Sequence, residues 1–470
     1  MPRSRVLMVA GAVLVLVPAC GSGKFAGAQS PPQAAASSED AFLRWSRTHA
    51  VSIASVEATD SLNDLRFLQP MAGEARVFAL GESGHGIHEF LAFRNRLATF
   101  LIQNLGFTAV AAETGVFEGM LVDDYINGGS LDVATAAQAA FQWDGSDRAL
   151  DENRALLEWL RRTNAATTGR RIHFYGIDLS GGDGRRGEIL RARRSVDAAV
   201  SYLQRCDGDA GAALRQRLEP FLGRFTSPEY AHLSIVERNA GTATLADLTS
   251  LLKRRRQDCL AVTSEAEYDR ALSNAVVARQ VDAMFRATPD PALKQLDLRD
   301  MAMARDAAMA ANLRSVLDHE GPNGRILLYA HNAHVMKVPM RRVAHPEAFR
   351  KSPTPMGQYL HSTLGNQLVV LGFAFQQGVG GDLPLPPSLP GSVDSELARV
   401  GPPLFAIDLR GGIHDPGASA WLRQPRMKRQ LNDPDDDRYA ELVPGDAFDA
   451  LVFVHTVSLA RPITTPGTLR

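Results

Sequence analysis

Side chains that can move protons follow four apolar segments of the sequence, at the point where each segment ends. In chain order they are Glu82 with His85, then Glu113, then Asp178, then His331 with His334. An imidazole beside a carboxylate can take a proton from water near neutral pH, because its ordinary pKa lies close to that range. Further imidazoles and a second carboxylate can position the water and stabilise the negative charge that grows on a carbonyl oxygen. These residue types therefore predict hydrolysis by activated water.

The elements that must position these residues are short apolar segments that alternate with helical patterns, which is typical of an α/β protein. Most of the segments are almost continuously apolar, as buried parallel strands are. We predict strands at Arg76–Leu80, Thr108–Ala112, Ile172–Ile177, Ile326–Ala330, Leu368–Phe375, Phe405–Leu409 and Ala450–Val454. In a largely parallel sheet the carboxyl ends of the strands form the ligand-binding edge, so the four groups of side chains are expected to converge there.

Residues 185–319 lack a strand pattern and carry amphipathic helical patterns, such as Val196–Leu203 and Leu245–Leu260. This stretch is predicted to be a helical insertion between two strands of the sheet. Beside the strand ends it would form a lid or cap that excludes water and selects substrates. Its basic run, Lys253–Arg256, is interpreted as a solvated helix face.

The neighbours of His85 favour a functional role for this residue. Gly84 and Gly86 flank it, and together they permit a tight turn and a close approach of a ligand to the backbone. Asp178, in contrast, is interpreted as the cap of the following helix. A covalent nucleophile has less support, because the chain contains no G-x-S-x-G motif and Ser83 lacks the strand-to-helix context of that motif.

Metal binding is the main rival interpretation of the same residues. Glu82, His85, His331 and His334 supply the ligand types of a zinc or manganese site. The two H-x-x-H spacings differ, however, from the helical H-E-x-x-H motif, in which both histidines share one helix face. A lipoprotein that binds haem or another ligand, with histidines as axial ligands, is an alternative from outside the enzymes.

The charge balance and the N-terminus bear on partners and location. A formal net charge of -1, from 51 Lys+Arg and 52 Asp+Glu, argues against a nucleic-acid-binding protein, which needs a basic face. Residues 1–28 resemble a signal peptide, because Arg3 and Arg5 precede an apolar run that ends in small residues. The end of this run fits either lipidation of Cys20, which would anchor the protein to a membrane, or ordinary secretion after cleavage at Ala28. We therefore expect an exported protein, periplasmic, membrane-anchored or secreted.

The remainder of the chain is predicted to form a disordered tether at 29–40 and one folded domain at 41–470. Two further cysteines, Cys206 and Cys259, lie in the helical insertion. In an oxidising compartment they can form a disulfide, but sequence alone leaves paired and unpaired thiols equally open.

The sequence resembles the erythromycin esterase family over nearly everything after Ala41. Residues 81–90 are similar to the family's G-E-x-x-H-G-x-x-E-F motif, and residues 330–335 to its A-H-N-x-H-V signature. Supporting matches are Glu113 after the second strand, Asp178 at a G-x-D strand end, Glu152 with 157–161, Arg305 and Asp306 with 309–313, and the segments 355–360 and 445–451. One departure lies within the first motif, where Ser83-Gly84 replaces the usual Ala-Thr pair.

This resemblance implies a carboxylic ester hydrolase that cleaves a small-molecule ester or macrolactone without a metal or another cofactor. The implied site consists of His85 as general base, Glu82 as its partner, Arg94 paired with Glu113, and His331 and His334 as the rest of the polar wall. The implied fold is a mixed sheet wrapped by helices, with the helical insertion over the cleft. Macrolide inactivation, and with it antibiotic resistance, is one role within this broad family.

Overall fold

The computed structural model describes most of the chain that follows the predicted signal peptide. The described residues are 33–58, 61–140, 149–179, 189–224, 227–288, 298–343, 351–380, 383–431 and 439–463. The predicted signal peptide at 1–28 lies outside them, Cys20 included, so export and lipidation stay predictions. Within the described ranges, none of the helices combines the length and the apolar composition that a lipid bilayer requires.

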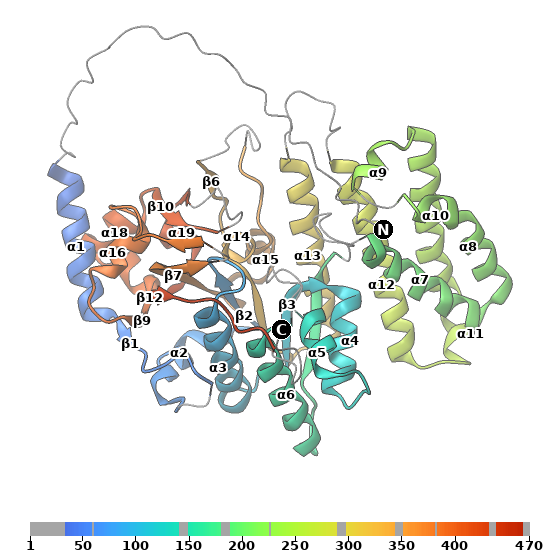
Figure 1. Cartoon of the computed structure of the whole chain (residues 1–470), viewed down its shortest axis with the longest axis horizontal. Helices are drawn as coiled ribbons and strands as arrows, with labels where there is room; N and C mark the ends of the chain where they lie inside the picture. Colours follow the sequence, from blue (N-terminus) through green and yellow to red (C-terminus); the bar gives the residue numbers. More distant parts are fainter. Residues whose placement is uncertain are drawn as a thin grey trace, which may run out of the picture.

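A mixed sheet forms the centre of the molecule (Figure 1). Its strands lie in the order β1 (Val51–Ser52), β9 (Leu404–Asp408), β12 (Ala450–Val457), β7 (Leu368–Gly380), β2 (Val77–Glu82), β5 (Ile326–His331), β3 (Ala109–Gly115) and β4 (His173–Asp178), and β8 (Leu383–Leu385) pairs with β7. All neighbours from β12 to β4 are parallel, whereas β9 pairs with β12 and β1 in antiparallel fashion. The predicted mixed, largely parallel sheet is therefore confirmed.

All seven predicted strands are present, with ends shifted by a few residues. β2, β3 and β5 are buried along their whole length, which explains their continuous apolar sequence. The short strands were not predicted, and neither was the second, antiparallel sheet of β10 (Arg426–Arg429), β11 (Tyr439–Leu442) and β6 (Arg341–Arg342). β10 and β6 are rich in basic residues, so an apolar run cannot reveal them.

Helices cover both faces of the sheet, as predicted. Successive residues of β2 alternate between the two apolar cores, because side chains along a strand point to opposite faces: Phe78 and Leu80 join one core, Val77 and Ala79 the other. The first core is completed by α2 (Leu68–Ala72), α3 (His88–Leu105), α4 (Val116–Ile126), α5 (Val133–Ala140) and α6 (Asp151–Ala166). The second is completed by α1 (Gln33–His49), α13 (Arg299–Glu320), α14 (Asn332–Val335), α15 (Met356–Leu364), α16 (Val393–Ala398), α17 (Leu409–His414), α18 (Pro416–Leu422) and α19 (Pro444–Ala447).

Between β4 and β5 the described residues are helical and build a third apolar core of their own. The helices are α7 (Ile189–Cys206), α8 (Gly208–Leu222), α9 (Ser227–Ala231), α10 (Ile235–Arg254), α11 (Arg256–Leu260) and α12 (Glu265–Ala287), and Figure 1 shows them as a bundle to one side of the sheet, with α12 against α4 and α13. A disulfide joins Cys206 to Cys259, whose Cα atoms lie 4.7 Å apart, which answers the question that the sequence left open. The role of the bundle as a lid stays a prediction.

The predicted disordered tether at 29–40 is wrong for residues 33–40, because α1 begins at Gln33 and includes them, whereas residues 29–32 lie outside the described residues. The run of three alanines at 34–36 favours a helix. The helix is held against the domain by apolar side chains further along it. Phe42 stacks on Trp421 of α18 with ring centroids 3.8 Å apart, and both rings are buried.

Removing both thiols of the disulfide, with Cys206→Ala and Cys259→Ala together, should lower the free energy of unfolding by about 4 kcal/mol, because the link closes a loop of 53 residues in the unfolded chain. Urea unfolding followed by circular dichroism measures this difference. Reductant should bring the parent protein down to the stability of the variant and leave the variant unchanged. Equal stability with and without reductant would contradict the disulfide.

Candidate active site

The turn after β2 brings a histidine against a buried glutamate. His85 Nδ1 lies 2.7 Å from Glu82 Oε1, and the Tyr329 hydroxyl donates a hydrogen bond to the other oxygen, Glu82 Oε2. The His85 side chain is 25% exposed, whereas that of Glu82 is 2% exposed. Because the carboxylate accepts from Nδ1–H, the proton-accepting atom of this imidazole is Nε2. The structure thus brings His85 and Glu82 into direct contact.

The glycines beside His85 form the predicted tight turn. Gly86 has a φ of 69°, a backbone conformation that residues with a Cβ rarely adopt. Gly84 has a different reason, because a Cβ there would lie 2.8 Å from the side chain of Leu431. A ligand was expected to approach the backbone closely at Gly84, but the side chain of Leu431 occupies that position.

His331, the last residue of β5, faces His85 with ring centroids 5.3 Å apart. Its Nδ1 accepts a hydrogen bond from the backbone N–H of Ala333 at 3.1 Å, so a neutral ring carries its proton on Nε2. Burial and the neighbouring His85 hold the pKa of His331 well below its usual value, which keeps the ring neutral. Its Nε2 is buried and has no hydrogen-bond partner in the described part of the chain. The ring is therefore a donor for a group that enters the site.

Glu113 connects three elements at the end of β3. Its Oε2 accepts from the backbone N–H of His331 at 2.8 Å, and its Oε1 accepts from Arg305 Nη2 at 2.7 Å and faces His334 Nε2 at 3.3 Å. Burial alone would raise the pKa of this carboxyl, but His334 and Arg305 outweigh burial and hold the pKa well below its usual value. Glu113 is therefore a buried anion at neutral pH.

Arg305 of α13 is the cation that balances two buried carboxylates. It donates to Asp178 Oδ2 at 2.6 Å and Oδ1 at 3.0 Å in addition to Glu113. The interpretation of Asp178 as a simple helix cap is therefore wrong, because its fully buried carboxylate belongs to this ionic cluster. Sequence reasoning gave no role to Arg305, since a charged residue on a helix resembles any solvated one. The one indication in the sequence was that Arg305 belongs to the segments that resemble the erythromycin esterase family.

His334 lies between two carboxylates, one from each side of the ring. Its Nδ1 is 2.8 Å from Asp306 Oδ1, and its Nε2 is 3.3 Å from Glu113 Oε1 and 3.1 Å from Arg305 Nη1. Burial and the Arg305 charge lower the pKa of this histidine, but the charges of Asp306 and Glu113 outweigh them and raise the pKa of His334 to about 10. His334 is thus an imidazolium at neutral pH, unlike His331 three residues earlier.

The predicted pair between Arg94 and Glu113 is wrong. The Arg94 guanidinium donates to Asn95 Oδ1 at 2.9 Å and to Asn153 Oδ1 at 3.0 Å, and its Cζ lies 4.9 Å from the centre of the Tyr329 ring. Arg94 therefore lies behind the tyrosine that contacts Glu82. Because α3 packs on the opposite face of the sheet from α13, the cation that reaches Glu113 is the one on α13.

The arrangement does not fit the rival metal site. Glu82 is occupied by His85 Nδ1 and the Tyr329 hydroxyl, and His334 by Asp306 and Glu113, so two of the four expected ligands already have other partners. The other histidine of the first motif, His88, is buried elsewhere, with Nδ1 2.6 Å from Glu152 Oε1. Across the described residues, no group of three or more His, Cys, Asp or Glu side chains could hold a metal ion.

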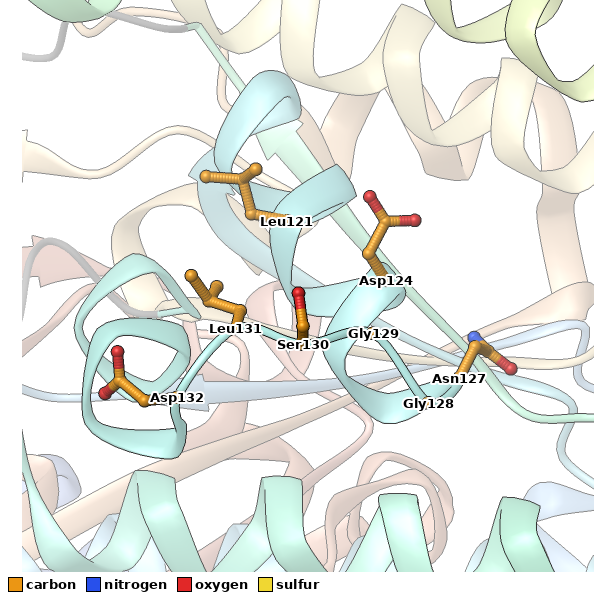
Figure 2. Close-up of a pocket in the computed structure, with 8 residues that line it drawn as sticks. All are labelled: Leu121, Asp124, Asn127, Gly128, Gly129, Ser130, Leu131 and Asp132. Atoms are coloured by element: carbon orange, nitrogen blue, oxygen red, sulfur yellow. The ribbon is translucent and has the colours of Figure 1, made fainter.

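A surface hollow of about 810 Å³ lies away from these residues, where α4 ends and leads to α5. Figure 2 shows its lining: Leu121, Asp124, Asn127, Gly128, Gly129, Ser130, Leu131 and Asp132. The neighbouring Asp123 contacts His173, the first residue of β4, so the hollow lies at the amino end of the strands. The ligand-binding edge of such a sheet is the opposite one, so we assign no chemistry to this hollow.

Comparisons with known proteins point to one family. The model of the family described as erythromycin esterase matches residues 102–457. Erythromycin esterase type II of Escherichia coli is 26% identical over 342 residues, which are 72% of this chain and 78% of that protein, and type I of Escherichia coli is 21% identical over 305 residues, 63% and 70% respectively. A solved structure of a Bacillus cereus protein covers 91% of this chain and 99% of its own with a TM-score of 0.75 at 21% identity. A solved erythromycin esterase mutant in its open conformation covers 88% and 99% with a TM-score of 0.65 at 16% identity.

Replacing Arg305 by methionine should lower the free energy of unfolding by about 3–5 kcal/mol, because two buried carboxylates lose their cation. Urea unfolding at pH 7 measures the loss. Arg217→Met, which breaks a half-exposed ion pair with Asp247, is the matched control and should cost at most about 1 kcal/mol. Similar losses in both variants would show that the Arg305 cluster is not a buried ionic centre.

The protonation of His334 should make stability depend on pH. A folded-state pKa of about 10 above the ordinary 6.5 means that this contribution is complete below pH 6.5 and is lost as the pH rises towards 10. The stability difference between the parent protein and His334→Gln should therefore shrink over that range. Unfolding curves at intervals from pH 6 to 10 test this, and a constant difference would contradict a protonated His334.

Proposed function

Because the chain belongs to the erythromycin esterase family, a family of hydrolases, we propose that it cleaves a carboxylic ester or macrolactone with water activated by His85. The observation that carries this proposal is the pairing of His85 with the buried Glu82 opposite a neutral His331. A base and a hydrogen-bond donor next to each other are what the addition of water to a carbonyl group requires.

His85 would act as general base through Nε2. The water oxygen attacks the carbonyl carbon while one water proton passes to this nitrogen. Glu82 accepts from Nδ1–H, so its negative charge orients the ring and stabilises the imidazolium that forms. The Tyr329 hydroxyl holds the other oxygen of Glu82, which fixes the direction of the carboxylate.

His331 would stabilise the tetrahedral intermediate. Its Nε2–H has no hydrogen-bond partner in the described residues and can donate to the oxygen that becomes negative when water adds. The backbone bond from Ala333 to Nδ1 fixes that tautomer before substrate arrives. The intermediate then collapses, the carbonyl carbon–alkoxide oxygen bond breaks, and the alkoxide takes the proton from the His85 imidazolium. The products are a carboxylic acid and an alcohol, or one hydroxy acid from a lactone.

The ionic cluster of Glu113, Arg305, Asp178, His334 and Asp306 would support this reaction indirectly. Through the backbone N–H of His331, Glu113 fixes the end of β5 and hence the position of the donor ring. His334 and Arg305, the principal cations beside Glu113, lower the pKa of this carboxyl and keep it ionised. A macrolide is one member of the proposed substrate class, as the names of the Escherichia coli relatives suggest.

Replacing His85 by alanine should reduce ester or lactone hydrolysis by at least about 100-fold, because the general base is lost, while the fold is retained. Macrolides and simple esters are assayed by mass spectrometry for the addition of one water in ¹⁸O-labelled solvent. His361→Ala removes an exposed histidine far along the chain and should keep the activity of the parent. The proposal fails if His85→Ala keeps full turnover, and its metal-independent form fails if chelation abolishes turnover.

A further inference from the structure

A second polar network lies next to the catalytic pair, where the ladder between β2 and β7 ends. The last pair in that ladder is Gly81 with Gly372, so the next residue of β7, Phe373, no longer faces β2 in register. Three side chains donate to the Phe373 carbonyl oxygen instead: the Ser83 hydroxyl at 2.5 Å, Lys428 Nζ at 2.6 Å and Asn332 Nδ2 at 3.1 Å. Side chains thus replace the missing backbone partners at this point.

The Ser83 hydroxyl also connects the other two donors. Ser83 Oγ accepts from Asn332 Nδ2 at 2.8 Å and from Lys428 Nζ at 3.0 Å. All three side chains are fully buried. Ser83 directly follows Glu82, and Asn332 directly follows His331. The network therefore joins the strand ends that carry the two halves of the catalytic pair.

Lys428 comes from β10, in the second sheet, and its ammonium group lies in the interior. Burial lowers its pKa, and its charge is balanced at long range by Asp394, whose Oδ1 is 4.0 Å from Nζ. An interior ammonium group needs acceptors for its hydrogens, and here they are the Ser83 hydroxyl, the Phe373 carbonyl and, at 3.4 Å, the Arg429 carbonyl. Without the hydroxyl the lysine would lose an acceptor. The serine that departs from the usual family motif is thus a partner of Lys428.

The fit around Asn332 is equally tight. A Cβ at Gly81 would lie 2.4 Å from Asn332 Oδ1, and a Cβ at Gly372 would lie 3.1 Å from the same atom. The amide therefore lies over β2 and β7. It leaves no space for a side chain on Gly81, and at Gly372 the Phe448 ring, 2.6 Å from such a Cβ, fills the space together with the amide. A shift of one strand against another would break this contact.

We propose that Lys428, Ser83 and Asn332 act as a positioning unit that fixes the ends of β2, β5 and β7 and so sets the separation of His85 and His331. This inference rests on the proposed function for its catalytic consequence. Ser83 and Lys428 could also be taken for a nucleophile and its base. The geometry opposes that interpretation, because the Ser83 proton is donated to a carbonyl oxygen and the hydroxyl is fully buried.

Replacing Lys428 by methionine should lower kcat by about 10- to 100-fold and leave KM within about twofold, because a loosened pair misplaces the reacting groups more than it weakens substrate binding. The matched control is Arg429→Met. Arg429 is the next residue of β10 and equally buried, but it donates to Gln376 O at 2.9 Å and Pro386 O at 2.8 Å rather than to Ser83. Both variants should lose stability, and only Lys428→Met should lose kcat in its folded fraction. Equal loss or no loss of kcat in the two variants overturns the proposal.

Ser83→Ala by itself keeps the experiment decisive if Lys428→Met does not fold. It restores the usual family residue and should lower kcat by a smaller factor with KM unchanged, and an unchanged kcat would overturn the proposal. Where Lys428→Met does fold, Ser83→Ala should have little further effect on it. Full additivity of the two effects would contradict a shared unit. Complete loss of turnover in Ser83→Ala, together with an acyl adduct on Ser83 in the parent protein, would make Ser83 the nucleophile instead.

Crystal structures of the parent protein, Lys428→Met and Arg429→Met separate this inference from the proposed function. The separation of the His85 and His331 ring centroids, 5.3 Å in the parent protein, should change in Lys428→Met and persist in Arg429→Met. An unchanged separation in Lys428→Met overturns the positioning unit whether or not any ester is hydrolysed. If the separation changes but the parent protein hydrolyses no ester, the proposed function fails and the positioning unit stands.

Discussion

The buried carboxylate of Glu113 is the interaction on which the geometry of the site depends. An ion inside a protein is tolerated only when charges and hydrogen bonds surround it. Glu113 meets this requirement with a backbone N–H from β5, Arg305 from α13 and His334 from α14. One side chain on β3 thus fixes the end of the adjacent strand and the helix that closes the insertion. The role proposed for His331 depends on this attachment, because the backbone N–H bonded to Glu113 belongs to His331 itself.

Three histidines of the site differ in what their Nδ1 atom contacts. His85 faces the Glu82 carboxylate, His331 a backbone N–H, and His334 the Asp306 carboxylate with a second carboxylate at Nε2. The first has Nε2 as its proton-accepting atom, the second stays neutral with its proton on Nε2, and the third is held charged. The same kind of side chain is therefore held in three protonation environments by its neighbours.

The strand ends could be predicted from the sequence, and the pairing of the charges could not. Parallel strands buried on both faces must be apolar along their length, so β2, β3 and β5 are visible as apolar runs, and the residues at their carboxyl ends mark the edge of the sheet where ligands bind. Arg94 and Arg305 both lie on helices, and which of them reaches Glu113 depends on the face of the sheet that each helix covers. Asp178 was mistaken for a cap because its partner is 127 residues away. The sequence does not indicate Lys428, because the strand that carries it is short and basic.

The site is held from two sides by different physical means. On the side of β3 and β4, ion pairs with two buried carboxylates fix the end of β5. On the side of β7, hydrogen bonds to one carbonyl oxygen fix the residues that follow Glu82 and His331. The His85 side chain, at 25% exposure, is more open than its 2% exposed partner Glu82. Water activation requires a base that reaches solvent while its orientation stays fixed. A partly exposed His85 held by a buried Glu82 meets both conditions.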